Sequence, residues 1–431
     1  MLFLGIDIGT SSVRCSVIDL NKNPVAQTKA PLATPESPAN GYFQQDATLW
    51  ADALTEALVG LTDKIDCQQI KAISVDATSS TVLLTDADNH PLTPALMYND
   101  SRAQDYPEKL KNIIPPENIA LSSTSSLAKS LWLLGSLDST TAVRYIAHQA
   151  DWINAWLTEK PGYSDVNNTL KTGYDSQQMC WPDWITAIKP NISGFLPDVD
   201  MTGKVIGKVS ANIAKRFSFS PETLVFRGTT DSTASVLATG ISQPGDAVTT
   251  LGTTMVMKVI SENPVESLTN GVYSHRLPSG LWLVGGASNS GGNVLLKYFD
   301  HELIAGLSAK IDINKPTNLN FYPLSTPGER FPVNDPHLAP RLLPRPESDI
   351  EFLQAIFEGF ANIEKMAYEK IARLGGNMPN RIVTAGGGAA HNSTLCAIRQ
   401  KSMDIPMETA TYTEASYGMA LVARSSFLDA N

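Results

Sequence analysis

Short apolar runs, each broken by a polar or glycine-rich turn, alternate along this chain with segments whose apolar residues recur at helical spacing. Residues 2–8 and 13–18 are two such runs on either side of a small polar turn, and this pattern predicts a β-hairpin. Residues 47–61 carry apolar side chains three and four positions apart, which predicts a helix. A further strand is predicted over residues 70–75 and runs into a polar stretch.

The turn of the first predicted hairpin carries groups suited to a phosphate. We expect Gly9 to allow a backbone geometry that residues with a Cβ atom resist. The hydroxyl and amide groups of Thr10, Ser11 and Ser12 can then converge on a phosphate. Asp7, at the end of the first strand, is placed to organise a hydrated Mg²⁺ ion. The alternative is an ordinary hairpin with a polar turn, because Asp-Gly turns are common.

A second segment repeats this design later in the chain. Residues 246–259 predict a strand, a Gly252-Thr253-Thr254 turn and a second strand. Two hairpins of one design in two halves indicate duplicated folds whose turns face each other across a phosphate-binding cleft. Shortly before, a strand over residues 224–230 ends at Asp231, which begins a helix of small residues and could simply cap it.

A run of glycines marks a third segment. The strand predicted over residues 381–386 ends in Gly386-Gly387-Gly388, and a helix is predicted from about Ser393. Consecutive glycines let a flat ring or a ribose approach the backbone, and a helix N-terminus favours anions. Glycine-rich turns between strand and helix occur in many α/β proteins, so this segment alone is a weak signal.

Asp100 and Arg102 lie two residues apart and share one face if the chain is extended there. Their side chains could pair with each other or contact a ligand. The residues themselves leave both interpretations open.

Length and composition restrict the class of protein. At 431 residues the chain exceeds the roughly 250–300 that one core supports, so we expect two domains, residues 1–238 and 239–431. The formal charge of -10 argues against nucleic acid as a partner and favours small molecules. We expect a cytoplasmic protein without a membrane partner, and four scattered cysteines predict free thiols. Monomer and homodimer both stay open.

A set of motifs occurs in a fixed order along the chain: Asp-x-Gly-Thr, Asp-Ala-Thr-x-Ser, Asn-Asp-x-Arg, Gly-x-x-Asp, Leu-Gly-Thr-Thr, Gly-Gly-Ala-Ser-Asn-x-Gly-Gly and Gly-Gly-Gly-Ala-x-x-Asn. This set resembles the FGGY family of carbohydrate kinases over nearly the whole chain. The resemblance implies an α/β fold of two ribonuclease-H-like domains, as in the actin, hexokinase and Hsp70 superfamily. It also implies a central cleft for ATP and a sugar or polyol.

The resemblance implies roles for individual residues. Asp7 would orient Mg²⁺, Thr10 and Ser11 would face the transferred phosphate, and Asp231 would be the base for the attacking hydroxyl. The expected contacts to ATP come from the two hairpin turns, from Gly291 and from the glycine run with the asparagine after it. They are Thr10, Ser11, Ser12, Gly252, Thr253, Thr254, Gly291, Gly387, Gly388 and Asn392.

The acceptor sugar is predicted from one short segment. Residues 73–80 look like the Asp-Ala-Thr-Cys-Ser segment of ribulose kinases and lack the Gln-Met-His-Gly of typical xylulose kinases. The resemblance thus favours D-ribulose over D-xylulose as the ketopentose. Residues 321–346 are similar to a compact cyanobacterial and plant-type D-ribulose kinase group. The expected substrate contacts are Asp76, Ala77, Thr78, Ser79, Asp100, Arg102 and Asp231.

The chain departs from the family pattern in three respects. Tyr98 stands where many relatives carry Trp, residues 227–230 replace a more glycine-rich approach to Asp231, and the chain is short. The first two departures touch the sugar pocket, so the sugar contacts are hypotheses. A kinase for another polyol and a non-catalytic sugar- and nucleotide-binding switch of the actin-like superfamily are the alternatives.

Overall fold

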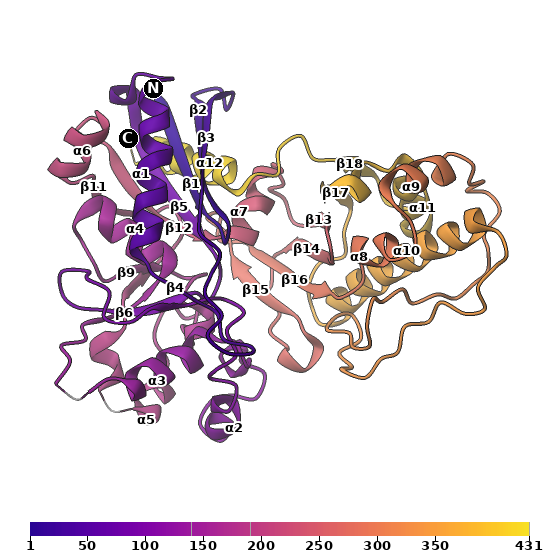
Figure 1. The fold of residues 1–431 in the computed structure, drawn as a ribbon, viewed down its shortest axis with the longest axis horizontal. Helices are drawn as coiled ribbons and strands as arrows, with labels where there is room; N and C mark the ends of the chain where they lie inside the picture. Colours follow the sequence, from indigo (N-terminus) through magenta and orange to yellow (C-terminus); the bar gives the residue numbers. More distant parts are fainter. Residues whose placement is uncertain (139, 190, 431) are drawn as a thin grey trace. The chain divides into compact units, whose positions relative to one another are not determined.

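The computed structural model describes residues 1–138, 140–189 and 191–430 (Figure 1). The chain falls into two compact units. The first comprises Met1–Ala238, His275–Gly280 and Glu414–Asn431, and the second comprises Thr239–Ser274 and Leu281–Thr413. The segment from Glu414, expected from the sequence in a domain of residues 239–431, groups with the first unit because its helix packs on that unit's strands.

A six-stranded sheet with the order β11-β12-β5-β1-β2-β3 forms the centre of the first unit. Its strands are β1 (Leu2–Ile8), β2 (Ser12–Asp19), β3 (Pro24–Pro31), β5 (Ile70–Ala77), β11 (Val205–Lys208) and β12 (Leu224–Thr230). The first predicted hairpin is confirmed as β1 and β2, which pair antiparallel. β5 runs parallel to both β1 and β12, so the C-terminal ends of these strands meet at one edge.

Different helices cover the two faces of this sheet. Leu4 and Ile6 of β1 pack in a core with α1 (Thr48–Thr62), α4 (Gln149–Thr158) and α6 (Ala211–Phe217). Phe3 points to the opposite face, where α12 (Ala415–Asp429) lies (Figure 1). α12 also packs against α7 (Asp231–Ala238). The helix predicted over residues 47–61 is confirmed as α1.

Two glycines allow α12 to approach its neighbours. A Cβ atom at Gly5 would lie 1.9 Å from the carbonyl oxygen of Ser416, and one at Gly418 would lie 2.0 Å from that of Ala234. A larger residue at either position would push α12 away from β1 or from α7, because close-packed interiors have no room for the added atoms. These contacts therefore fix where α7 begins relative to the end of β1.

A smaller sheet with the order β4-β7-β6-β8 and several short elements complete the first unit. Ser125 caps α3 (Ser126–Ser136) by accepting a hydrogen bond from the amide of Ala128 at 3.2 Å. The elements are β4 (Gln44–Gln45), β6 (Val82–Thr85), β7 (Ala95–Leu96), β8 (Tyr145–His148), β9 (Tyr163–Asp165), β10 (Asp198–Asp200), α2 (Tyr106–Leu110), α3 (Ser126–Ser136) and α5 (Trp184–Ile188).

The second sheet has the order β15-β16-β14-β13-β17-β18. The second predicted hairpin is confirmed as β13 and β14, and β17 runs parallel to β13. Among the described residues, no helix has the length and apolar character needed to cross a membrane. The elements are β13 (Asp246–Leu251), β14 (Met255–Ser261), β15 (Tyr273–Arg276), β16 (Trp282–Ser288), β17 (Arg381–Gly386), β18 (Met407–Thr409), α8 (Gly292–Leu296), α9 (His301–Ser308), α10 (Asp349–Arg373) and α11 (Ser393–Met403).

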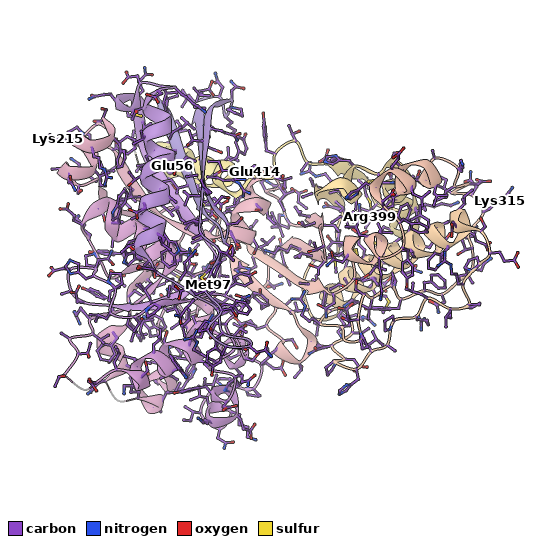
Figure 2. All side chains as sticks on the ribbon, viewed as in Figure 1. Glu56, Met97, Lys215, Lys315, Arg399 and Glu414 are labelled. Carbon is purple, nitrogen blue, oxygen red and sulfur yellow. The ribbon has the colours of Figure 1, made fainter. Side chains whose placement is uncertain are left out.

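A buried ion pair joins α10 and α11 in the second unit. Arg399, labelled in Figure 2, donates hydrogen bonds of 2.7 Å to both carboxylate oxygens of Glu364. Both side chains are almost completely buried. Arg399 also donates to Thr384 on β17, while Thr249 on β13 donates to Glu364. The pair thus ties two helices to two strands.

We expect Arg399→Met to lower the free energy of unfolding by about 3–5 kcal/mol, because it leaves the Glu364 carboxylate buried without its cation. Urea unfolding measures this change. The exposed Arg373→Met at the end of α10 is the matched control and should change stability by less than about 0.5 kcal/mol. Equal effects of the two substitutions would contradict the prediction.

Candidate functional site

Three carboxylates gather at the C-terminal edge of the first sheet. Asp7 and Asp76 occupy matched positions on the parallel strands β1 and β5, so their side chains point to the same face. Asp231 follows β12 directly and is the first residue of α7. β5 extends through Asp76 and Ala77, beyond the strand predicted over residues 70–75, because its backbone continues to pair with β1.

Burial and repulsion determine the charge of this cluster. Burial raises the pKa of Asp7 to about 6, the charge of Asp231 adds to the increase, and Arg14 opposes it. Burial also raises the pKa of Asp76 well above its usual value, and the charges of Asp7 and Asp231 raise it further. Arg14 lies 3.2 Å from Asp7 and 3.7 Å from Glu414. Burial and mutual repulsion thus favour protonation within the cluster, and the charge of Arg14 opposes it.

The donor set fits a hard divalent cation. Both carboxylate oxygens of Asp76 are buried and accept no hydrogen bond from an N–H or hydroxyl donor among the described residues; the neighbouring carboxyl of Asp7 could bond to them only by carrying a proton. Buried polar atoms nearly always have a partner, and Mg²⁺ prefers carboxylate oxygens and water. Asp7 and Asp76 together thus fit a Mg²⁺ ion, whereas the sequence analysis assigned Asp7 to the metal and Asp76 to the substrate.

The turn between β1 and β2 is tight, for a different reason from the one predicted. Gly9 does not have a positive φ. Its amide donates to the carbonyl oxygen of Ser12 at 3.1 Å, and a Cβ atom would lie only 3.2 Å from that same oxygen. A larger residue would have to move this carbonyl by a few tenths of an ångström, so the close approach favours glycine. Thr10 is half-buried, Ser11 is exposed and Ser12 is buried, so Thr10 and Ser11 are open to a ligand.

The predicted sugar segment after β5 is partly engaged within the protein. Thr78 donates through its amide at 3.2 Å and its hydroxyl at 2.6 Å to the side-chain oxygen of Gln149. Ala77 is buried within β5. Ser79 is half-buried, and Ser80 behind it has a positive φ of 69°. Among these residues Ser79 stays the open candidate for a sugar hydroxyl.

Asp100 and Arg102 pair with each other. Asp100 is fully buried, and its two oxygens accept hydrogen bonds from the side chain of Arg102 and from the amide of Phe43. The guanidinium also lies over the rings of Tyr42 and Trp132, at 4.7 and 5.1 Å from their centroids. The structure thus contains the pairing that the sequence left open, and a sugar contact of Asp100 or Arg102 would have to coexist with it.

A cavity of about 590 Å³ opens in the second unit. Its walls come from the ends of β13 and β17, from α8 and α9, and from the start of α11. Five predicted nucleotide contacts line it: Gly252, Thr253, Gly387, Gly388 and Asn392. Two others, Thr254 and Gly291, do not belong to the lining, and Gly292 takes the place beside Gly252.

The glycine run leaves open space at the cavity. A Cβ atom at Gly387 or Gly388 would meet no atom within 4 Å, so protein packing does not require glycine at these positions. Their lack of side chains leaves open space against the backbone at the cavity wall. Asn392 accepts a 2.9 Å hydrogen bond from the amide of Leu395 and so caps α11. Its amide group donates to Ser308 of α9 at 2.8 Å.

Most of the lining side chains, largely apolar, were not predicted from the sequence. They come from the end of β13, from α8, α9 and α10, from the turn before α11 and from α11 itself, which meet only in the folded unit. The apolar face of residues 301–308 was the available signal. The missed residues are Leu251, Asn293, Leu295, Leu296, His301, Ile304, Ala305, Phe357, Ala389, His391 and Leu395.

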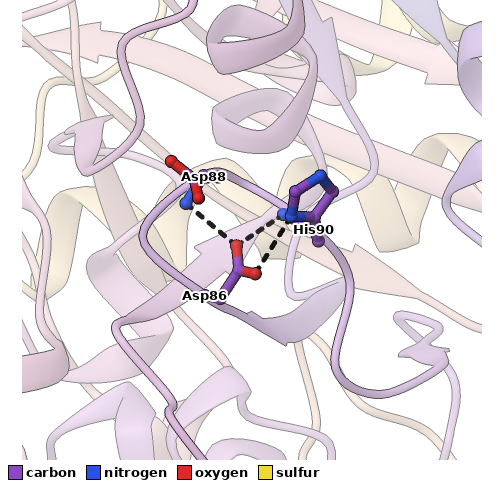
Figure 3. A group of neighbouring side chains, drawn as sticks. All are labelled: Asp86, Asp88 and His90. Atoms are coloured by element: carbon purple, nitrogen blue, oxygen red, sulfur yellow. Dashed lines mark hydrogen bonds and ion pairs between the residues drawn. The ribbon is translucent and has the colours of Figure 1, made fainter.

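A second acidic group lies in the loop after β6. Asp86, Asp88 and His90 have ligand atoms within 4.8 Å of one another (Figure 3). Asp86 already accepts hydrogen bonds from the amides of Asp88 and His90 at 2.9 Å and contacts the His90 ring. These bonds close a turn, so we assign the group no metal.

Comparison with known families matches both halves of the chain. Residues 2–238 match the N-terminal domain of the FGGY family of carbohydrate kinases, and residues 247–426 match its C-terminal domain. The chain is 25% identical to a xylulose kinase of Lactococcus lactis subsp. lactis (strain IL1403) over 412 residues, which are 90% of this chain and 80% of that protein.

Solved structures share the fold. A "xyloylose kinase" from Brucella ovis matches 100% of this chain and 91% of its own, with a TM-score of 0.89 and 22% identity. A gluconate kinase from Lactobacillus acidophilus matches 100% of this chain and 90% of its own, with a TM-score of 0.87 and 20% identity. The two-domain α/β architecture expected from the motifs is therefore confirmed.

We expect Asp76→Asn to stabilise the metal-free protein by at least about 1 kcal/mol at pH 8, and by less at pH 4. The folded state raises the pKa of Asp76, so it binds more protons than the unfolded state. The free energy of unfolding of the wild type thus falls as pH rises above the usual pKa of Asp, and Asn removes this loss. Urea unfolding in EDTA measures both values.

The exposed Asp63→Asn is the control for this measurement and should shift stability by less than about 0.5 kcal/mol at both pH values. A wild type that gains stability relative to Asp76→Asn between pH 4 and pH 8 would contradict the assignment.

Proposed function

Because the chain belongs to the FGGY family of carbohydrate kinases, we propose that it uses ATP to phosphorylate the terminal hydroxyl of a ketopentose, D-ribulose before D-xylulose. The general activity is that of a sugar kinase, which transfers a phosphate to an alcohol. The observation that carries the proposal is the cluster of Asp7, Asp76 and Asp231 at the strand ends of the first unit.

Asp231 is the proposed general base. It lies at the start of α7 and is half-buried, so a substrate hydroxyl can reach its carboxylate. The carboxylate would accept the hydroxyl proton as the new oxygen–phosphorus bond forms. Its basicity need not be high, because that proton becomes acidic only in the transition state. Phosphoryl transfer depends mainly on alignment and charge neutralisation, so one such base suffices.

Asp7 and Asp76 are the proposed holders of Mg²⁺. A bound Mg²⁺ would neutralise charge on the phosphates of ATP. The two carboxylates sit beside the turn that carries Thr10 and Ser11, whose hydroxyls would hydrogen-bond the transferred phosphate. Arg14 holds Asp7 in place through its 3.2 Å ion pair.

The cavity of the second unit is the proposed nucleotide site. Leu295, Ile304 and Phe357 offer apolar surface for a base, and Gly387 and Gly388 leave room against the backbone for a ribose. The turn at Gly252 and Thr253 suits phosphates through the amide and hydroxyl of Thr253, because the Gly252 amide already donates to the carbonyl oxygen of Thr254 at 3.0 Å.

The choice of acceptor rests on residues 76–80, which look like the corresponding segment of ribulose kinases. Ser79 is the contact that we propose within it, since Thr78 is engaged with Gln149. D-Xylulose is the second candidate, because several relatives that match most of this chain are named xylulose kinases. A non-catalytic switch is the alternative of another class.

We expect Asp231→Asn to lower kcat by about 10²–10⁴-fold, because the amide cannot accept the hydroxyl proton. The dissociation constant of ADP, measured by calorimetry, should stay within about twofold of wild type. The exposed Asp63→Asn is the control and should keep kcat. An Asp231→Asn protein that retains turnover would remove Asp231 from the mechanism.

The acceptor is identified by ADP release with Mg²⁺ and ATP across D-ribulose, L-ribulose, D-xylulose, ribitol, gluconate and glycerol. We expect the highest kcat/KM with D-ribulose, and Ser79→Ala should raise the KM for D-ribulose about tenfold by removing one hydrogen bond. A higher kcat/KM for D-xylulose would replace D-ribulose as the acceptor. No rise above the rate without acceptor would favour the switch.

A further inference from the structure

Glu329 is a buried acidic side chain in the proline-rich segment 321–346, and none of the roles above uses it. It is only 2% exposed and does not belong to the cavity lining. Its carboxylate is saturated by four hydrogen bonds from the amides of Asn289 (2.7 Å) and Arg330 (2.8 Å) and from the hydroxyls of Ser288 (2.7 Å) and Tyr322 (2.9 Å). Two of these donors lie at the end of β16.

The hydrogen bonds continue from Glu329 to the second phosphate turn. The hydroxyl of Ser288 donates to Glu329 and also accepts a 3.0 Å hydrogen bond from the amide of Ser290. The carbonyl oxygen of Ser290 accepts one of 2.7 Å from the amide of Met255. Met255 is the first residue of β14, directly after the Gly252–Thr254 turn. Glu329 therefore supports both the end of β16 and the start of β14.

The two loops supported in this way interlock. The amide of Gly292 donates to the carbonyl oxygen of Gly252 at 2.9 Å, and that of Asn293 donates to Thr253 at 3.3 Å. A Cβ atom at Gly291 would lie 2.6 Å from the Cα atom of Thr254, so the loops touch without a side chain between them. Gly252, Thr253, Gly292 and Asn293 all line the cavity.

We infer that Glu329 is a positioning residue for nucleotide binding: it holds the two interlocked loops, whose amides at Gly252, Gly292 and Asn293 bond within the loops themselves, in the conformation that forms the wall of the cavity next to the phosphates of ATP. This inference rests on the proposed nucleotide site. A carboxylate suits the role because it accepts from four donors at once, and hydrogen bonds to a charged acceptor are the stronger ones. Glutamine has the same shape but only one acceptor oxygen and no charge, so its amide group would have to donate to the hydroxyls of Ser288 and Tyr322, and the two backbone amides would lose a charged acceptor.

The test compares full-length wild type, Glu329→Gln and Ser288→Ala, with Glu347→Gln as a matched control at an exposed position directly after that segment. Calorimetry gives the dissociation constant of Mg²⁺-ADP, and steady-state kinetics give kcat and both KM values. We expect Glu329→Gln to weaken ADP and raise the KM for ATP roughly tenfold. kcat at saturating ATP and the KM for D-ribulose should stay within about twofold, as should every value for Glu347→Gln.

The same data decide against the inference in several ways. Unchanged ADP affinity in Glu329→Gln would overturn it. A lower kcat together with a higher KM for the sugar would also overturn it, because that result indicates a merely structural role. The double variant with Ser288→Ala should be no weaker than Glu329→Gln alone, and additive losses would exclude the route through Ser288. Wild type that binds no ADP would instead overturn the proposed nucleotide site itself.

If Glu329→Gln fails to fold, Tyr322→Phe removes a single donor to the same carboxylate and keeps the ring. It should weaken ADP about threefold without changing the KM for the sugar. Wild-type ADP affinity in Tyr322→Phe would then overturn the inference.

Discussion

The first unit depends on one close contact, the approach of α12 to β1 and α7 at Gly5 and Gly418. Without side chains at these positions, the helix lies against the backbone of both elements. Ser16 and Ser416 share a 2.8 Å hydrogen bond across the same interface. Because α7 begins at Asp231, its packing on α12 determines where that carboxylate stands relative to Asp7 and Asp76. The geometry of the carboxylate cluster is thus set by main-chain packing one layer away.

The second unit supports a hairpin of similar sequence by other means. The turn at Gly252–Thr254 is held by backbone hydrogen bonds from the neighbouring loop, which Glu329 supports through Ser288 and Ser290. Below the sheet, the Arg399–Glu364 pair ties α10 and α11 to β13 and β17. Close glycine contacts thus occur in both units, but in the first they seat a helix, α12, whereas in the second they join two loops that a buried carboxylate supports.

Local patterns were enough to predict the elements that carry the candidate site. The two hairpins, the position of Asp231 at a helix start and the glycines before α11 each depend on a few neighbouring residues. Features that depend on distant partners were not predictable. Asp76 has no hydrogen-bond donor because of what surrounds it in the folded sheet. Phe357 lies on α10, which begins at Asp349, far along the chain from the Gly252–Thr254 turn that shares the cavity with it. Asp100 and Arg102 are near neighbours in the sequence, so their pairing could be considered from it. The rings of Tyr42 and Trp132 that cover Arg102 come from distant parts of the chain and could not be predicted.

The place of α12 has a consequence for biosynthesis. Residues 239–413 leave the ribosome after most of the first unit and before the helix that completes it. Until α12 arrives, the face of β1 that carries Phe3 and Gly5 has no cover, and the ends to be joined are separated by hundreds of residues. Closing so long a loop is entropically costly and slow relative to forming local contacts. The first unit therefore keeps this apolar surface exposed while the ribosome synthesises the second unit. During that interval the nascent chain is most prone to aggregation and would benefit most from a chaperone.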